Sequence, residues 1–126
     1  MLNVIPLALA GLLALGVMVI GCLYVLAPER AVGSFGLRPP SSDADTRAWL
    51  RLKGIRDFAS GLVVLTVMLV AGPRMVGVVL LAFAIVPFGD MSNILASGGS
   101  KAKAFSIHAV TCAVMLVVGL LLIHAI

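Results

Sequence analysis

Long apolar segments are the feature that most limits the folds open to this chain. Residues 4–26 carry no charge, and residues 74–97 and 101–124 are apolar over most of their length. A helix of about 20 apolar residues is long enough to cross the hydrocarbon core of a bilayer. Hydrophobic residues make up 62% of the chain, whereas soluble domains are about 45–50% apolar. We therefore predict an integral membrane protein.

The apolar segments and the turns between them predict the fold class. Gly72-Pro73 and Gly98-Gly99-Ser100 are typical of tight turns between helices. Short connections of this kind join antiparallel neighbours in a bundle. We predict a single all-α domain over residues 1–126, a transmembrane up-and-down four-helix bundle that self-associates as a homo-oligomer. Its helices are expected at residues 4–26, 45–71, 74–97 and 101–124.

The first predicted helix could be mistaken for a signal peptide. We expect residues 4–26 to be a retained helix and not a signal peptide, because no Lys or Arg precedes them. The segment also exceeds the usual apolar length of about 7–15 residues in a signal peptide.

In the third helix, Pro87 and Gly89 predict a kink. Pro87 also frees a backbone carbonyl that another polar group can bond.

Residues 28–44 form the only long connection. Pro28 favours the first turn of a short helix and Gly36 favours its end. Pro39-Pro40 then predicts an extended segment. Two interpretations remain open: a connector that lies on the membrane surface, or a cap over the mouth of a pocket.

The basic residues predict the orientation in the membrane. Arg30 and Arg38 lie in the long connection, and Lys101 and Lys103 follow the turn after the third helix, whereas Arg74 stands alone on the opposite side. The positive-inside rule then makes loop 28–44 cytoplasmic and puts both termini on the non-cytoplasmic side, in what we expect to be a bacterial plasma membrane. The same distribution explains the net charge of +4 without nucleic acid, since no basic face is large enough to follow a phosphate backbone.

The segment 51–61 brings charge close to the apolar residues 58–70. Lys53, Arg56, Asp57 and Ser60 are spaced i, i+3, i+4 and i+7, so they share one face of the helix. Charged groups beside hydrocarbon are costly and usually mark a ligand site, a transport pathway or an ion-pair network.

Polar residues also follow one face of each of the last two helices. Asp90 and Asn93 are three residues apart, as are His108 and Thr111. With a rise of about 1.5 Å per residue, Asp57, Asp90 and His108 reach the same depth within about one turn in an antiparallel bundle. The sequence therefore predicts a shared site in the cytoplasmic third of the membrane.

The leading functional hypothesis is a pocket that binds, and can transform by acid/base chemistry, a small lipophilic molecule. Asp57 or Asp90 would be the base, and His108 would relay a proton because its unperturbed pKa is about 6.5. Whether the chain is an enzyme stays open; isomerisation or hydrolysis would fit these groups. The candidate ligand-binding residues are Lys53, Arg56, Asn93, Ser60 and Thr111.

Two other hypotheses use the same residues. In the first, the chain is a structural or interaction subunit, and the charges only tie helices together, Arg56 with Asp90 and Lys53 with Asp57. In the second, they form the relay of a proton-linked transporter. We expect no metal and no cofactor, because the two histidines lie roughly 24 Å apart along one helix and no Gly-rich phosphate loop is present.

Several short motifs resemble those of a known family. They are Ala27-Pro28-Glu-Arg, Phe35-Gly36-Leu37, the segment Arg51-Leu-Lys-Gly-Ile-Arg-Asp57, Gly89-Asp90 and a late His108. Together they are similar to the small membrane proteins of domain-of-unknown-function family 4267, and in outline to DoxX-like proteins. The resemblance covers nearly the whole chain and implies an integral membrane protein of four helices. It implies no activity and assigns no catalytic residue.

Overall fold

The computed structural model describes residues 3–124, which are helical apart from short connections and contain no strand. Apolar segments that end at Gly, Pro or capping residues account for most of the helix ends. The α-helices are α1 (Val4–Leu26), α2 (Pro28–Phe35), α3 (Ala44–Val70), α4 (Pro73–Phe83), α5 (Ile85–Ala96), α6 (Lys101–Lys103) and α7 (Val110–His124), with a π-helix η1 (Ala104–Ala109) between the last two.

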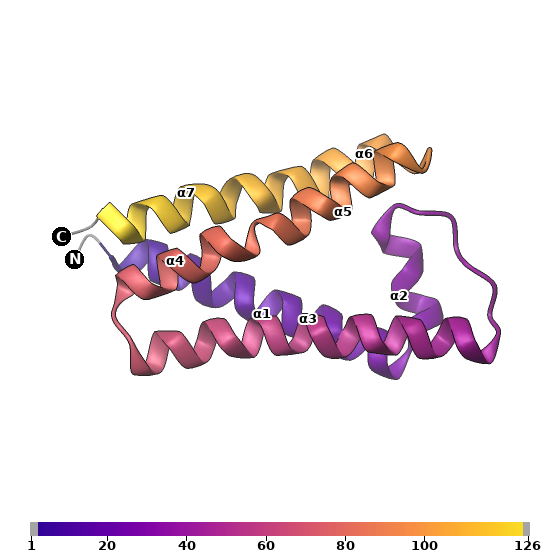
Figure 1. Cartoon of the computed structure of the whole chain (residues 1–126), viewed down its shortest axis with the longest axis horizontal. Helices are drawn as coiled ribbons and strands as arrows, with labels where there is room; N and C mark the ends of the chain where they lie inside the picture. Colours follow the sequence, from indigo (N-terminus) through magenta and orange to yellow (C-terminus); the bar gives the residue numbers. More distant parts are fainter. Residues whose placement is uncertain (1–2, 125–126) are drawn as a thin grey trace.

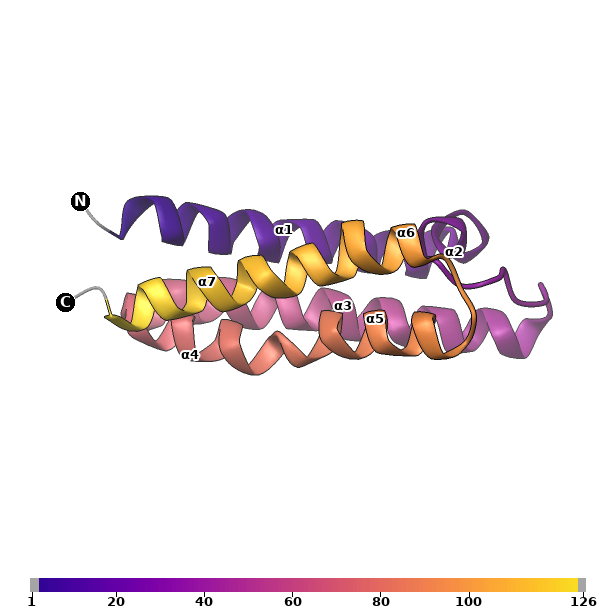
Figure 2. The ribbon, with the colours of Figure 1, turned by 90° about the horizontal axis from the view of Figure 1, so that it is seen from above.

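The long helices form two pairs (Figure 1). In the first, α1 packs along α3; in the second, α4 and α5 pack along η1 and α7. The pairs approach each other where α1 and α3 meet α4 and α7, and they diverge toward α2. Seen from above in Figure 2, the long helices run along one common axis, with the described ends of α1 and α7 at the same end.

Glycines allow the helices of each pair to approach closely. A Cβ atom added to Gly54 of α3 would lie 2.6 Å from the backbone oxygen of Gly21 in α1. In the second pair, a Cβ added to Gly77 of α4 would lie 2.6 Å from the oxygen of Gly119 in α7. Small residues at helix crossings are typical of membrane proteins, where van der Waals contact drives helix association.

Three helical segments are long and apolar enough to cross a membrane. They are Val4–Leu26, Pro73–Ala96 and Lys101–His124, with mean hydropathies of 2.5, 2.0 and 2.4. The α3 helix is long enough but does not belong to this group, because charged residues occupy its first half. The chain is thus an all-α membrane protein with three evident spanning segments, and the part that α3 plays is taken up below.

Two irregularities interrupt the second helix pair. The helix predicted at 74–97 breaks at Ala84, between α4 and α5, three residues before the predicted kink at Pro87. The thiol of Cys112 in α7 bonds the Ala84 carbonyl at 3.5 Å. The second irregularity is η1, in which the helix widens over residues 104–109. Such π segments are rare and often occur at functional sites.

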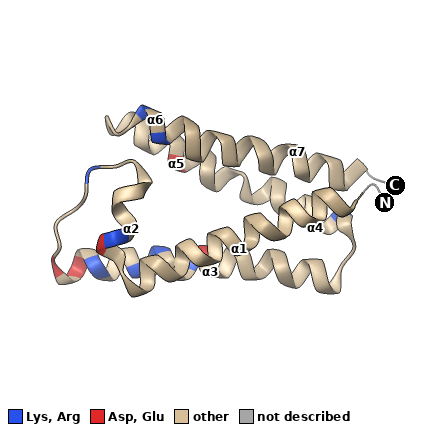
Figure 3. Cartoon of the chain, turned by 180° about the vertical axis from the view of Figure 1, so that it is seen from behind, with Lys and Arg blue, Asp and Glu red and all other residues tan. Residues whose placement is uncertain are grey.

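The short helix α2 crosses the open end of the two pairs (Figure 1). Pro28 begins it, and Gly36 ends it in the left-handed conformation with φ of 116°, as the sequence predicts. The next helix, α3, begins at the N-cap Asp43, whose side chain accepts a hydrogen bond from the Thr46 backbone N–H. Figure 3 shows that most of the charged residues lie at this end of the molecule.

Candidate functional site

A cavity of about 640 Å³ lies between the two helix pairs. Pockets for small molecules commonly measure about 300–1,000 Å³. Residues from α1, α2, α3, α4, α5, η1 and α7 line this cavity. It exists because α3 and α5 diverge instead of packing together, as the separation of the pairs shows (Figure 1).

One side of the cavity is apolar and follows α1. Leu9, Leu13, Val17 and Ile20 line it together with Gly16, at helical spacing along one face. These positions extend over about 17 Å at a rise of about 1.5 Å per residue. Leu9 and Ile20 also remain 38% and 47% exposed to the surroundings of the protein. The apolar side is therefore elongated, and it is open along α1.

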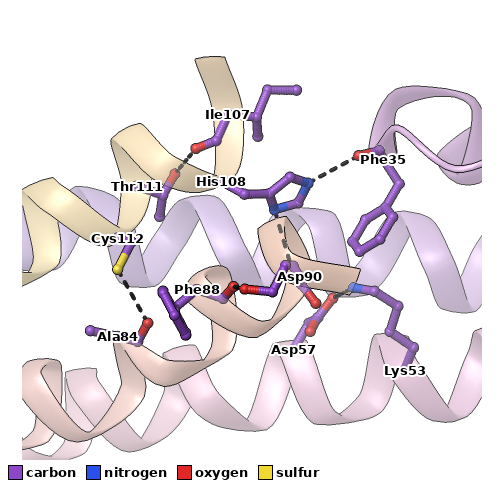
Figure 4. Close-up of polar contacts among 11 residues, drawn as sticks. Phe35, Lys53, Asp57, Ala84, Phe88, Asp90, Ile107, His108, Thr111 and Cys112 are labelled. Carbon is purple, nitrogen blue, oxygen red and sulfur yellow. Dashed lines mark hydrogen bonds and ion pairs between the residues drawn. The ribbon is translucent and has the colours of Figure 1, made fainter. Parts of the chain in front are cut away.

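The other end of the cavity is polar, and an ion pair lies in it (Figure 4). Lys53 Nζ donates to Asp57 Oδ2 at 2.5 Å, one turn along α3. The same ammonium group lies 4.4 Å from the ring centre of Tyr24 and 5.1 Å from that of Phe35. Cation–π attraction strengthens when the groups are shielded from water. The Lys53 ammonium is thus held by one carboxylate and two aromatic rings.

His108 joins the polar end to α2. Its Nε2 lies 3.0 Å from the Phe35 carbonyl oxygen, and because a carbonyl can only accept, Nε2–H is the donor. Its ring also meets the Phe35 ring edge-on, with centroids 4.8 Å apart. Its other ring nitrogen, Nδ1, lies 3.7 Å from Asp90 Oδ2, which is an ion-pair distance when the ring is protonated. That separation is too long for a hydrogen bond, so the Asp90 carboxylate has no hydrogen-bond partner among residues 3–124.

Three carbonyl groups at the end of α2 are bound by residues of the turn after α5, of α6 and of η1. Besides the His108 contact, Lys103 Nζ donates to the Gly33 oxygen at 2.6 Å, and Ser100 N donates to the Gly36 oxygen at 2.8 Å. The last carbonyls of a helix lack partners within it, and a cation there also interacts favourably with the helix dipole. The C-terminal end of α2 is therefore fixed to α6 and η1.

The beginning of α2 is fixed to the first helix pair instead. Arg47 Nε of α3 donates to Glu29 Oε1 at 2.6 Å. The pKa of the Glu29 carboxyl lies below its usual range, first because its own backbone N–H bonds it and then because Arg47 does. Both groups are half-exposed, so we expect this ion pair to contribute little to stability on its own.

Tyr24 is the second polar residue at this end without a partner. It lines the cavity and is only 3% exposed, yet its hydroxyl makes no hydrogen bond to another residue within 3–124. The hydroxyl oxygen is not fully enclosed by protein, so it is accessible from the cavity. Tyr24 is therefore part of the cavity wall, with its ring buried and its hydroxyl free to accept or donate a hydrogen bond.

The structure brings together six of the eight candidate residues. Lys53, Asp57, Ser60, Asp90, His108 and Thr111 all line the cavity. The hydroxyls of Ser60 and Thr111 donate to carbonyls of their own helices, at 2.8 Å and 2.7 Å. Each can therefore still accept a hydrogen bond from a ligand.

The other two candidates lie outside the cavity. Arg56 and Asn93 are exposed and line no part of it. The predicted ion pair of Arg56 with Asp90 is absent from the described chain. The pair of Lys53 with Asp57 forms, but it lies within α3 and does not tie two helices together. The prediction treated residues spaced i, i+3, i+4 and i+7 as one face of α3. This face was too wide, because Arg56 lies outside the cavity that Lys53 lines.

Sequence reasoning missed two features of the site. From the sequence, Phe35 was placed only in a motif similar to those of a known family, although its carbonyl and ring both contact His108. The π-helix was not predicted, and no residue type in 104–109 marks it. Pro28 and Gly36 limit α2 to eight residues, but nothing in the sequence sets the direction that brings Phe35 to His108.

The chemistry open to this site follows from the groups that are free. The Asp57 carboxylate is paired with Lys53, whereas the Asp90 carboxylate can accept a proton or a hydrogen bond from a bound molecule. Within residues 3–124, no three His, Cys, Asp or Glu side chains are grouped closely enough to hold a metal ion. The arrangement can bind a polar group beside an apolar chain, and it can exchange a proton at Asp90.

Comparison with known proteins gives one result. No curated protein and no solved structure matches the chain. A family model described as "Domain of unknown function (DUF4267)" matches residues 14–122, which include every residue of the polar end of the cavity. On that match, the chain belongs to the DUF4267 family.

Proposed function

We propose that α3 crosses the membrane together with the three evident spanning segments, so that the protein is a transmembrane up-and-down four-helix bundle. Its length of 27 residues supports this, since about 20 suffice to span a bilayer. The charged residues in the middle of α3 also have favourable surroundings, because Lys53 and Asp57 line the cavity and form an ion pair with each other. Charges inside membrane helices are tolerated under these conditions.

The loops on either side of α3 provide the test of this topology. Ser42 precedes α3 and Gly72 follows it, so single cysteines at these positions should react with a membrane-impermeant thiol reagent from opposite sides. The positive-inside rule predicts that Ser42→Cys reacts from the cytoplasmic side. Reaction of both variants from one side would show that α3 does not span.

The cavity carries the functional proposal: it binds a small lipophilic molecule, with the apolar part of the molecule along α1 and its polar group at the α2 end. The supporting observation is the combination of a volume of about 640 Å³ with polarity confined to one end. An amphiphile would enter from the bilayer along the exposed side of α1, where Leu12 is 65% exposed.

Binding is favoured over a purely structural role by the packing. Protein interiors are close-packed, and voids larger than a water molecule are few. Charges that only order a bundle would be surrounded by packed side chains, and both carboxylates would have partners. Here Asp90 has no hydrogen-bond partner among the described residues, and the space beside it is large enough for a ligand.

Filling the cavity tests this proposal. Gly16 lines the cavity, and a Cβ atom added there would have no other atom within 4 Å. The side chain of the variant Gly16→Phe should therefore start in open space and fill part of the apolar side. Gly89→Phe is the matched control, because Gly89 also has open space around it but does not line the cavity.

The measurement is the fluorescence of a solvatochromic dye with a single alkyl chain, titrated into the protein in lipid nanodiscs. The wild type and Gly89→Phe should bind the dye saturably, whereas Gly16→Phe should lose at least about tenfold in affinity, since about 1.4 kcal/mol corresponds to that factor. Equal binding by all three proteins would refute the proposal and favour the structural alternative. Proton-coupled flux of the dye across vesicles would favour the transporter.

A further inference from the structure

The charge balance of the polar end points to the class of ligand. Apart from His108, whose charge depends on its protonation, one positive charge from Lys53 stands against two negative charges from Asp57 and Asp90. Arg56, the nearest further cation along α3, is exposed and outside the cavity. A charge set in a low-dielectric site is tolerable when it is balanced and hydrogen-bonded. When His108 is neutral, the polar end therefore lacks one positive charge.

Tyr24 gives an independent indication that a polar group binds here. It is 97% buried, since only 3% of it is exposed, and it lines the cavity with no hydrogen-bond partner among residues 3–124. Its hydroxyl oxygen is not fully enclosed by protein, so a molecule in the cavity can reach it. A ligand group that can donate both to the Tyr24 oxygen and to the Asp90 carboxylate would satisfy both.

An ammonium group has these properties, and the site already holds one. Lys53 Nζ is bound by the Asp57 carboxylate and by the rings of Tyr24 and Phe35. A second ammonium beside Asp90 would bring the polar end to two positive and two negative charges. It would also have three N–H donors, so it can bond Asp90 and Tyr24 together.

We infer that the ligand of this cavity is a single-chain amphiphile with an ammonium head group, bound between Asp90 and Tyr24 with its hydrocarbon chain along α1. This inference rests on the proposed function, because it needs the cavity to bind an amphiphile at all. It adds a specific selectivity: a cationic head group is preferred over a neutral or anionic one on the same chain.

Three probes of equal chain length test that selectivity. Dodecylammonium, dodecanol and dodecanoate are each titrated against the dye-loaded wild type in nanodiscs of zwitterionic lipid. Dodecylammonium should displace the dye at concentrations about 10- to 100-fold lower than the other two, as expected for a charge-assisted hydrogen bond to Asp90. Equal or stronger displacement by dodecanol or dodecanoate overturns the inference.

Asp90 variants then locate the effect. Asp90→Asn should remove the advantage of dodecylammonium, and Asp90→Glu should restore most of it. Asp45→Asn is the control for attraction to surface charge, since Asp45 is an exposed residue in the first turn of α3. An Asp90→Asn protein that folds and keeps the full preference for dodecylammonium contradicts the inference.

Proton competition provides a measurement on the wild type if Asp90→Asn does not fold. Asp90 is faced by Lys53 and Asp57 of α3, His108 of η1 and Tyr24 of α1, while α2 offers only the uncharged Ser34 and Phe35. Protonation of Asp90 would remove the charge that attracts the ligand. Because aspartic acid is ordinarily protonated below about pH 4, dodecylammonium should bind more weakly at pH 3 than at pH 8, whereas dodecanol should not. A preference for dodecylammonium that is unchanged at pH 3 contradicts the inference.

The controls separate the two proposals. If Gly16→Phe abolishes binding of all three amphiphiles but none is preferred, the cavity function stands and the ammonium inference fails. If Gly16→Phe affects none of them, the cavity function itself fails.

Discussion

Removal of the His108 ring should release α2 from the bundle. In His108→Ala the Phe35 carbonyl loses the donor at 3.0 Å, and Phe35 loses its edge-on ring contact. A buried carbonyl without a partner costs about 1–3 kcal/mol, and an aromatic contact of this kind contributes about 0.5–1.5 kcal/mol. The closed position of α2 should therefore lose about 2–4 kcal/mol.

Amide hydrogen exchange measures this change directly. A loss of about 2–4 kcal/mol corresponds to opening that is roughly 30- to 1,000-fold more frequent, and the α2 amides should exchange faster by that factor, because local opening controls their protection. His124→Ala is the matched control, since His124 is exposed in the last turn of α7. His108→Gln, which keeps an N–H donor, should recover part of the protection.

The result that refutes this reasoning is specific. If α2 exchanges at the wild-type rate in His108→Ala, the His108 contact does not hold it. If exchange rises equally along α1, α3 and α7, His108 supports the whole bundle and not α2 alone.

Two further predictions concern packing and capping. Gly54→Ala should destabilise the protein by about 1–3 kcal/mol, because the added methyl group overpacks against Gly21. Gly89→Ala, in open space, should stabilise the protein by up to about 1 kcal/mol. Reversible unfolding in detergent compares the two variants, and equal effects would contradict the close crossing of α1 and α3. Hydrogen bonds from Ser41 and Thr46 hold the pKa of the Asp43 carboxyl well below its usual range, so its capping of α3 is fully present above pH of about 4 and is lost as the pH falls toward the lowered pKa. The Thr46 amide should exchange faster, relative to its intrinsic rate, as the pH falls through that window, and Asp43→Asn, which caps without titrating, should abolish that dependence.

The sequence was a good guide to the helices and to the level of the site. The observed segments Val4–Leu26, Ala44–Val70, Pro73–Ala96 and Lys101–His124 lie within one residue of the predicted bounds. Gly and Pro punctuation and the length of a membrane span both act locally along the chain, so they can be read from it. The rise per residue is also a local property of a helix, so it could predict that Asp57, Asp90 and His108 lie near one another, as they do in the cavity wall.

The side chains that enter the cavity were harder to predict, because they depend on how the helices rotate and separate. Arg56 and Asn93 each follow Lys53 and Asp90 by three residues, which is a difference of about 60° around a helix, and they lie outside the cavity wall. The π-helix that carries His108 has no sequence signature of its own. The cavity itself comes from the divergence of α3 and α5, which is a property of the assembled helices.

The way α2 is fastened has a consequence for which molecules fit. Glu29 joins its first turn to one helix pair, and the carbonyls of Gly33, Phe35 and Gly36 join its last turn to the other. A helix of eight residues is about 12 Å long and does not stretch. Because α2 is bound to both helix pairs, it limits how far they can separate at the polar end. No helix connects the two pairs in this way along the apolar side of the described cavity. Selection should therefore be strict for the width of the head group and lenient for the length of the chain behind it.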